Sequence, residues 1–515
     1  MSASYRCGGW TTFAMVLISQ ALVAGAAQGQ TVRWTNPAGG AFGDGNNWDA
    51  LHPPASTDTA AFGPAAAYVV TLAGTTSAAN MVVDQGSPTI DGGGNRLNIG
   101  AITPGPGDLT IAGPIASPAT LTFMNGSLRI PLFGNLNLGV AAGTAGTMVL
   151  ESGATMPIGF CNIGGSGTGY FLVRGTAADV GLPDTGGNGS VHLLPGSTVR
   201  VEGGSLVTRL FDHHGGRIEV VGGSMNVSVW PATGGGSSLF TGGATVHCGA
   251  PMQNAGSMVV SGGAVVSPVT FDVNGDVLVD GPGSALNSGS DMIGAPATFG
   301  VVNGGAARWP NGCHFTAPAV VTIGSGSTFG TGDFELDSGT FHVDQGALVS
   351  LNRLILTGAD TLQVSLDGAS LPSSPVISGT GTMASTLAGG VTARFAHPNN
   401  LRVGDSVELI RCAVPYQGTF APLASPSIGG GRQLELQYTV SSVFLTVIAG
   451  GPSCWTADFD GDGSIGTDAD ILAFFACLEG TCCPTCAPAD FDGNGTVGTD
   501  ADIEAFFRIL AGGPC

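Results

Sequence analysis

Two short acidic runs near the C-terminus have the residue types and the spacing of cation-binding loops. The first begins at Asp458 and the second at Asp490; each places Asp or Asn at positions one, three and five and Gly at position six. Oxygen-bearing side chains at these positions wrap a hard cation, the glycine makes the sharp turn, and residue seven offers its carbonyl. We therefore expect two calcium sites, with ligands from Asp458, Asp460, Asp462, Ser464, Asp490, Asp492, Asn494 and Thr496.

The residue that closes each loop is open to two interpretations. The twelfth position, which normally supplies the closing carboxylate, is alanine in both runs, and aspartates lie on either side of it. Asp468 and Asp500 occupy position eleven, whereas Asp470 and Asp502 occupy position thirteen. We favour Asp470 and Asp502 as ligands because the apolar helical run begins immediately after them.

An apolar run follows each loop, over residues 471–478 and 503–510, and is expected to form a helix whose acidic start suits the helix dipole. No helix is expected before the first loop, so these are not complete EF-hands. The duplicated loop–helix unit resembles a dockerin domain, and its Cys-bearing, Gly-Thr-Asp-Ala-Asp form resembles the module that ends many exported bacterial surface proteins. The resemblance covers residues 454–515. It implies calcium-dependent folding and docking to a cohesin-like or other surface receptor protein.

The cysteines indicate an oxidising compartment. Six of the 11 lie within residues 454–515, and an even, dense cluster in a small exported module is typical of a disulfide framework, here with fifteen possible pairings. A zinc site formed by Cys482, Cys483 and Cys486 is the alternative, but adjacent cysteines suit a tetrahedral site poorly. Four dispersed cysteines are expected to be small buried apolar residues: Cys161, Cys248, Cys313 and Cys412.

The N-terminus has the pattern of a secretory signal peptide over residues 1–27. Arg6 precedes an apolar stretch, residues 12–23, which runs into small residues at 24–27. A retained N-terminal anchor is the alternative. No later apolar stretch approaches the length of a membrane span, so we expect no transmembrane segment after cleavage and an extracellular or cell-surface location.

The elements that must carry this module form a repeat. Short runs of β-forming residues end in glycines that recur at nearly even intervals, at Gly203, Gly222, Gly242, Gly262, Gly281, Gly304 and Gly324. A period of about 20 residues is too long for one hairpin and suits one coil of three short strands and three turns. We therefore predict an all-β fold, a right-handed parallel β-helix over residues 68–390, attached to a small α-helical, disulfide-rich calcium-loop domain.

The ends of the rod need caps that cover exposed strand edges. Residues 28–67 form the expected N-terminal cap, which contains Trp34, Phe42, Asn47, Trp48, Pro53, Asp58 and Phe62. This arrangement resembles the opening of many exported bacterial β-helix proteins with autotransporter-like repeats. Residues 391–449 lose the period and are predicted to be a C-terminal β cap or small sandwich, joined by a linker at 450–453 to the dockerin-like domain.

Composition excludes some functions. All 15 basic residues are Arg and the net charge is −21, which disfavours nucleic acid as a partner. Absence of Lys also removes Schiff-base chemistry. Aromatic residues are sparse, which disfavours a long sugar-stacking groove.

Two groups of side chains on the rod could serve catalysis. Asp333, Glu335 and Asp337 are interpreted as a solvated acidic face, whereas Asp212, His213 and His214, with Arg217, are interpreted as an exposed turn. No catalytic residue is assigned, and a non-catalytic role is favoured. We expect a secreted or cell-surface structural or adhesive protein docked through its calcium module; the alternative is a polysaccharide-active lyase or glycosidase, or a carbohydrate binder.

Overall fold

The computed structural model describes residues 29–511 except 101–106, 132, 181–188, 233, 290–291, 295–297, 317, 425, 430, 451–456, 484–488 and 492–495. The predicted signal peptide therefore lies outside the described residues. No described helix combines the length and the apolar character needed to cross a membrane.

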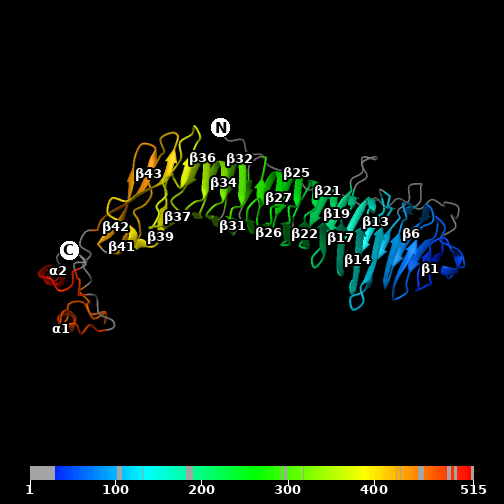
Figure 1. Ribbon diagram of the computed structural model, residues 1–515, viewed down its shortest axis with the longest axis horizontal. Helices are drawn as coiled ribbons and strands as arrows, with labels where there is room; N and C mark the ends of the chain where they lie inside the picture. The colour runs from blue at the N-terminus through cyan, green and yellow to red at the C-terminus, as the bar shows by residue number, and fades with distance from the viewer. Residues whose placement is uncertain are drawn as a thin grey trace, which may run out of the picture.

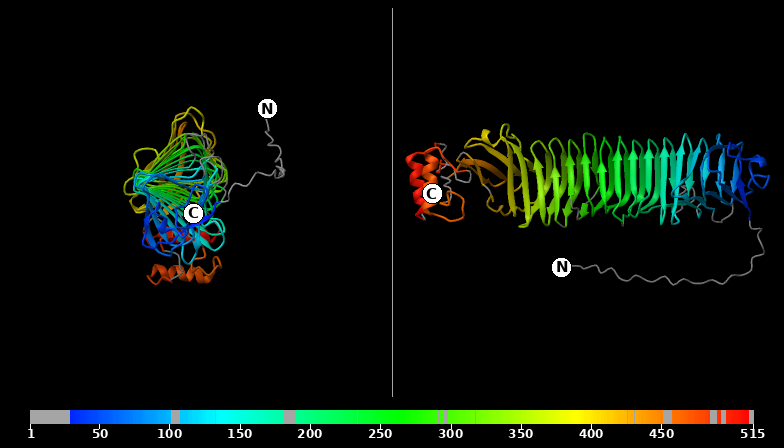
Figure 2. Two further views of the ribbon diagram at one scale, coloured as in Figure 1. Left: turned by 90° about the vertical axis from the view of Figure 1, so that its right-hand side faces the viewer. Right: turned by 90° about the horizontal axis from the view of Figure 1, so that it is seen from below.

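Residues 31–449 form a long rod of stacked coils, and two helices lie beyond its C-terminal end (Figure 1; Figure 2, right). Seen end on, the coils superimpose (Figure 2, left). Successive strands pair in parallel along the rod, which confirms the predicted parallel β-helix. Two sheets account for the named strands of the described residues, one with 17 strands and one with 26.

The 17-stranded sheet, called the first sheet below, contains one strand from nearly every coil: β2 (Gly40–Ala41), β4 (Ala67–Thr71), β7 (Ser87–Asp91), β10 (Gly113–Pro114), β11 (Ala119–Met124), β14 (Thr144–Glu151), β17 (Thr168–Arg174), β20 (Thr198–Glu202), β22 (Arg217–Val221), β24 (Ser237–Thr241), β26 (Ser257–Val260), β28 (Val277–Asp280), β31 (Thr298–Val302), β33 (Ala319–Ile323), β35 (Gly339–Asp344), β37 (Asp360–Asp367) and β39 (Gly390–Ala396).

The 26-stranded second sheet supplies the other two faces: β1 (Thr31–Trp34), β3 (Thr59–Phe62), β5 (Thr76–Ala78), β6 (Asn80–Val83), β8 (Arg96–Ile99), β9 (Leu109–Ile111), β12 (Ser127–Arg129), β13 (Asn135–Leu138), β15 (Thr155–Ile158), β16 (Phe160–Ile163), β18 (Ala177–Val180), β19 (Ser190–Leu193), β21 (Ser205–His213), β23 (Ser224–Val229), β25 (Thr245–Asn254), β27 (Val265–Val273), β29 (Ala285–Asn287), β30 (Met292–Gly294), β32 (Ala306–Phe315), β34 (Thr328–Leu336), β36 (Leu348–Leu356), β38 (Ile377–Gly379), β40 (Ser406–Cys412), β41 (Ser427–Gly429), β42 (Arg432–Tyr438) and β43 (Ser442–Ala449).

One coil shows how three faces arise from two sheets. β24 lies in the first sheet, and β25 follows it in the second, where its pairing with β27 shifts register between Cys248 and Pro251. The shift divides the long strand into two halves, each of which pairs with the same half of the next coil. Each coil therefore has three strand segments and three corners, as the repeat period predicts.

The pairing register measures the coil length directly. Along the first sheet Val199 pairs with Ile218, which pairs with Ser238, and Ser238 pairs with Met258, so one coil matches the interval between successive marker glycines. Between about residues 90 and 150 the coils are longer, because Ile90 pairs with Phe123 and Phe123 with Leu150. Insertions at the corners lengthen these coils without disturbing the strands, which explains why the repeat is weaker there.

The interior of the rod is apolar along its length. Strand residues alternate between buried and outward-facing positions, and the buried ones form one continuous core. Aromatic rings from consecutive strands stack inside the core, as in the pair of Phe334 on β34 and Phe341 on β35, whose centroids lie 4.5 Å apart. At the corners, the marker glycines except Gly324 adopt the left-handed conformation, with φ of +64° at Gly222 and Gly242 and +57° at Gly262.

The N-terminal end of the rod is closed by an aromatic cluster. Trp34 and Trp48 pack edge to face with centroids 5.0 Å apart, and Phe42 and Phe62 contact Trp48. The buried Asn47 side chain donates to the Ala41 carbonyl at 2.9 Å. β1 and β3 pair in parallel with each other and β3 with β6, so coil stacking continues into the segment expected as a cap.

The C-terminal end changes from parallel to antiparallel pairing. β39 pairs in parallel with β37, and β40 in parallel with β38, so the coils extend to about residue 412. β40 then pairs antiparallel with β43, which pairs antiparallel with β42. The four dispersed cysteines are free thiols and buried, as predicted.

Candidate functional site

The first acidic loop brings three carboxylates together in front of helix α1 (Asp468–Leu478). One oxygen each from Asp458, Asp460 and Asp462 lies within 4.8 Å of the other two. The loop is held by its own backbone, because the Gly463 amide donates to Asp458 Oδ2 at 3.1 Å and the Ser464 amide to Asp462 Oδ1 at 2.7 Å. An all-oxygen donor set of this charge fits a hard divalent cation such as calcium.

Asp470, expected as the closing ligand, lies outside that group of three carboxylates. Its carboxylate is fully buried and accepts hydrogen bonds at Oδ1 from the amide of Phe459, at 2.6 Å, and at Oδ2 from the amide of Thr467, at 2.8 Å. Thr467 Oγ1 also donates to Oδ2 at 2.9 Å, and the two residues form a capping box at the start of α1. Asp470 therefore closes the loop by joining its first turn to the helix through hydrogen bonds.

These hydrogen bonds also determine how Asp470 ionises. Burial raises the pKa of the carboxyl, but the hydrogen bonds from the amides of Thr467, Asp460 and Phe459 lower it more, so its pKa lies below the ordinary aspartate value. Asp470 is consequently a carboxylate at neutral pH. Asp468, the alternative closing residue, is exposed.

The second loop repeats the same construction in front of helix α2 (Asp500–Leu510). The buried Asp502 accepts from the amide and from Oγ1 of Thr499, both at 2.8 Å. Asp490 is half-buried and Thr496 exposed, whereas Asp492 and Asn494 lie outside the described residues. Both helices begin with the same capping box, so the duplicated unit includes the start of the helix as well as the acidic run.

Four phenylalanines form the centre of this C-terminal module. Phe459 and Phe491, the second residues of the two loops, are fully buried with Phe474 and Phe506 from the two helices. The rings of Phe474 and Phe506 stack with centroids 4.2 Å apart. Each loop is therefore anchored by its second residue in the core that joins the helices, which couples the position of the carboxylates to the packing of the module.

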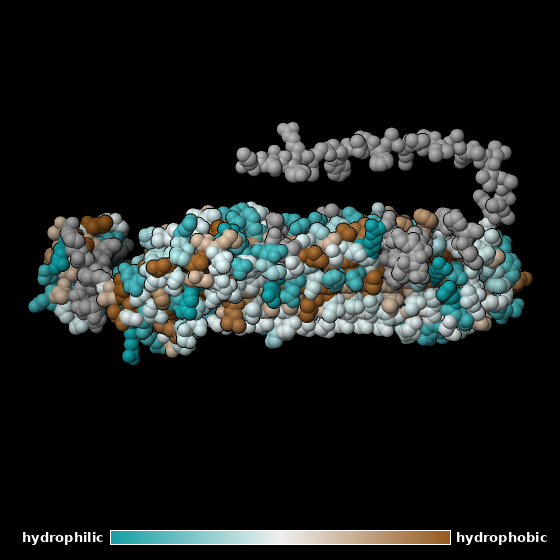
Figure 3. Space-filling model, turned by 90° about the horizontal axis from the view of Figure 1, so that it is seen from above, coloured by the Kyte–Doolittle hydropathy of each residue, from teal (hydrophilic) through white to brown (hydrophobic). Residues whose placement is uncertain are grey.

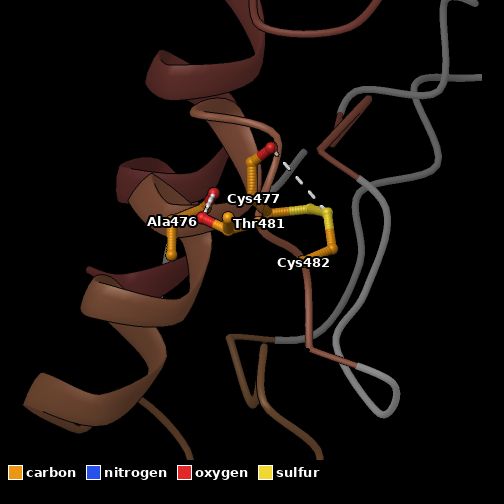
Figure 4. The surroundings of a disulfide bond; sticks show 4 residues. All are labelled: Ala476, Cys477, Thr481 and Cys482. Carbon is orange, nitrogen blue, oxygen red and sulfur yellow. Dashed lines mark hydrogen bonds between the residues drawn. A yellow bond between two sulfur atoms is a disulfide. The ribbon is translucent and has the colours of Figure 1, made fainter.

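A disulfide bond secures the end of α1. Cys477, in the last turn, is bonded to Cys482, and the Thr481 amide and Oγ1 each donate to the Ala476 carbonyl at 2.9 Å (Figure 4). Cys483 is disulfide-bonded as well. The zinc alternative with Cys482 as a ligand is therefore wrong, because that sulfur is already bonded. Cys454, Cys486 and Cys515 lie outside the described residues.

The module also exposes apolar side chains. Phe475 and Phe507, equivalent residues of the two helices, contact each other with centroids 6.2 Å apart and remain 41% and 40% exposed. Leu472 is 70% exposed. Exposed apolar residues gathered beside a charged surface are typical of protein-binding sites. We call these three residues the apolar face of the module.

Two members of the acidic group proposed on the rod have partners on neighbouring coils. Asp333 Oδ2 lies 2.5 Å from Arg353 Nη2, and Asp337 Oδ1 lies 3.1 Å from His314 Nε2. Asp333, Glu335 and His314 help line a depression of about 250 Å³. That volume is below the range of about 300–1,000 Å³ usual for small-molecule pockets.

The interpretation of residues 212–214 as an exposed turn is wrong. Asp212 and His213 belong to β21, and His213 is buried with its Nε2 2.8 Å from the Gly216 carbonyl oxygen. Burial lowers the pKa of His213 below its ordinary value. Arg217 pairs with Glu219 at 2.5 Å and does not join Asp212 in an ion pair among the described residues.

A groove runs across the corners of successive coils. It measures about 800 Å³ and is lined by residues 196–198, 215–217, 235–237, 255–257 and 274–276. It exists because glycines stack there: a Cβ on Gly256 would lie 1.8 Å from the Gly236 carbonyl oxygen. The charged residues of its lining are Arg217 and Asp276.

The chain matches no protein-family model and no curated protein. Among solved structures it is similar to the crystal structure of the Haemophilus influenzae Hap adhesin, with a TM-score of 0.26 and 11% sequence identity. The similarity covers 76% of this chain and 64% of that one, so the chain spans less than two thirds of its length. Function is therefore argued below from the sites themselves.

Proposed function

We propose that this protein is an exported, non-catalytic surface rod that docks to a receptor through a calcium-dependent C-terminal module. The observation that carries the proposal is the convergence of Asp458, Asp460 and Asp462 within 4.8 Å, in a module that also exposes an apolar face. Three carboxylates this close repel one another unless a cation lies between them. Calcium would therefore fix the loops and the helices that present the apolar face.

The proposed location follows from the covalent chemistry of the module. The Cys477–Cys482 disulfide suits an oxidising compartment outside the cytosol. The signal peptide predicted at residues 1–27 would direct the chain there. A cell-surface or extracellular location is thus part of the proposal.

The rod is proposed to act as a spacer or adhesive surface. The groove lining contains one carboxylate, Asp276, whereas glycoside hydrolysis normally uses a pair. Asp276 is also engaged, since it accepts from the amide and from Oγ1 of Thr298 at 3.0 and 2.7 Å. The face in Figure 3 shows apolar residues in separate patches on a mostly pale surface, which suits weak adhesion over a long length.

The docking proposal is tested with the oxidised full-length chain and envelope fragments of the producing cells. Retention is expected in calcium and loss in EGTA. Phe475→Ser combined with Phe507→Ser should abolish retention while leaving the melting temperature of the module nearly unchanged, because both rings are partly exposed. Exposed Val440→Ser, on the rod, is the matched control. Equal retention in calcium and EGTA would contradict the proposal.

A second candidate function, carbohydrate binding, is favoured by the groove alone. Its backbone-rich, partly polar lining could accept an extended sugar chain across several coils. Soluble polysaccharides of the cell envelope should then raise the melting temperature of the rod, and Arg217→Ala should reduce that shift. If no polysaccharide of a broad panel changes the melting temperature of the rod, carbohydrate binding is rejected and the spacer function is retained.

A further inference from the structure

Two histidines and an aspartate from successive coils converge on the outer face of the second sheet. His192 lies on β19 and pairs in register with Asp212 on β21, and His214 follows immediately after β21. One ligand atom from each of the three lies within 4.8 Å of the other two. Asp212 Oδ2 lies 3.3 Å from His192 Nδ1 and 2.8 Å from His214 Nε2.

The coil geometry explains this convergence. The interval between His192 and Asp212 equals one turn of the β-helix at this face, so their side chains stack in neighbouring strands. His213, between Asp212 and His214, is buried. Strand alternation therefore directs Asp212 and His214 outward together. The side chains are 34%, 20% and 36% exposed for His192, Asp212 and His214, so the group is half-buried and accessible to an ion.

A buried hydroxyl orients the first imidazole. Ser190, which is 3% exposed, places Oγ 2.8 Å from His192 Nε2. If the ring hydrogen is on Nε2, His192 donates it to Ser190, and Nδ1 presents its lone pair toward Asp212. Metal-binding histidines commonly have their second nitrogen fixed in this way by a hydrogen-bond partner.

We propose that His192, Asp212 and His214 form a zinc site, with water as the fourth ligand. Two imidazoles and one carboxylate are typical of zinc, whereas calcium prefers oxygen donors alone. Neighbouring ligand atoms around tetrahedral zinc lie about 3.4 Å apart. The His192–Asp212 distance of 3.3 Å already meets this spacing, and His214 has to move outward by a fraction of an ångström.

The other histidine-containing group of the rod fits zinc less well. His314, Glu335 and Asp337 offer one imidazole and two carboxylates, and His314 Nε2 is 4.0 Å from the nearer Glu335 oxygen. Asp337 is also more exposed than Asp212. This group therefore serves as an internal comparison for the proposed site.

Zinc at this site would join two coils. The ion links β19 to the second half of β21, and β19 belongs to the longer coil that runs between the paired residues Phe171 and Val199. A longer coil forms the same number of strand pairs but orders more residues, so its folding costs more conformational entropy. A cross-link between coils therefore stabilises the rod most where the coils are long. The inference is independent of the C-terminal module.

The test measures zinc bound to the oxidised full-length chain by equilibrium dialysis in saturating calcium, which occupies the acidic loops. Wild type should bind one zinc ion more than His192→Ala combined with His214→Ala. His247→Ala, which removes an exposed imidazole elsewhere on the second sheet, is the matched control and should bind as wild type does. Ser190→Ala should weaken zinc binding by roughly 10- to 100-fold without changing its stoichiometry.

Equal stoichiometry and affinity in wild type and in the double histidine variant would overturn the proposal. So would a loss of binding in His314→Ala with retention in the double variant. If the double variant fails to fold, Asp212→Asn replaces it, because the amide keeps the shape of the carboxylate and removes its charge. Unaltered zinc affinity in Asp212→Asn would likewise overturn the site.

Discussion

The rod and the C-terminal module both fold from chain that is rich in small residues, but they are stabilised in opposite ways. In the rod, stacked coils bury a continuous apolar core, and charged side chains are few, some of them paired between coils, as in Arg174–Glu202 and Arg353–Asp333. The module has a core centred on four phenylalanines and contains eleven of the 36 acidic residues, with one arginine. The rod is therefore expected to depend on backbone packing, and the module on hydrogen bonds, disulfides and cations.

The largest effect is expected where coil backbones meet. Gly256→Ala would put a Cβ 1.8 Å from the Gly236 carbonyl oxygen, so the coils must separate. We expect a loss of about 3 kcal/mol or more, seen as a lower melting temperature of the rod. Gly235→Ala is the matched control, because a Cβ there meets nothing within 4 Å. Similar melting temperatures for the two variants would refute packing as the basis of rod stability.

The next effect separates the two roles of carboxylates in the module. Asp470→Ala leaves the buried amide of Phe459 and the half-buried amide of Thr467 without their acceptor and should cost about 2–3 kcal/mol in calcium and in EGTA alike. Asp460→Asn keeps an acceptor for the Asp462 amide but removes a charge, so it should lower the melting temperature only in calcium. Thermal melts of both variants in both buffers make the comparison. Calcium-specific loss in Asp470→Ala would instead identify Asp470 as a ligand.

A smaller effect is expected from the helix cap. Thr467→Ala removes the hydroxyl that caps α1 and should destabilise the module by about 1 kcal/mol. Ser464→Ala, at an exposed loop position whose carbonyl is kept, should change stability little. Urea melts followed by far-UV circular dichroism in the helical region test this pair, and equal midpoints would argue against the capping box.

The smallest effect is a pH dependence of the rod. Hydrogen bonds from Arg174 and Arg200 lower the pKa of Glu202 below its ordinary value. A depressed folded-state pKa contributes stability above the unfolded-state pKa, about 4.3, which is lost as pH falls through the folded-state value. The melting temperature of wild type should exceed that of Glu202→Gln near neutral pH, and the difference should shrink below about pH 4. A constant difference would contradict the ion-pair account.

The features that the sequence could predict also differ between the rod and the module. The coil length could be predicted because glycines such as Gly222 and Gly242 mark corners that need a positive φ. Helix positions were predictable from the apolar runs after each loop. The hydrogen bonds of Asp470 were not, because spacing along the chain does not show which backbone amides a carboxylate accepts from. His192 and Asp212 are separated in the sequence by the length of one coil. Their proximity could be recognised from this interval only once the strand register was known.

Calorimetry of the full-length chain in calcium and in EGTA tests the central claim most directly. The account predicts two transitions, of which only the one belonging to the module moves to a higher temperature in calcium. At a calcium concentration 100 times the Kd, binding raises the free energy of unfolding of the module by about 2.7 kcal/mol per site. The rod transition should stay where it is. A module transition at the same temperature in calcium and EGTA would contradict the account.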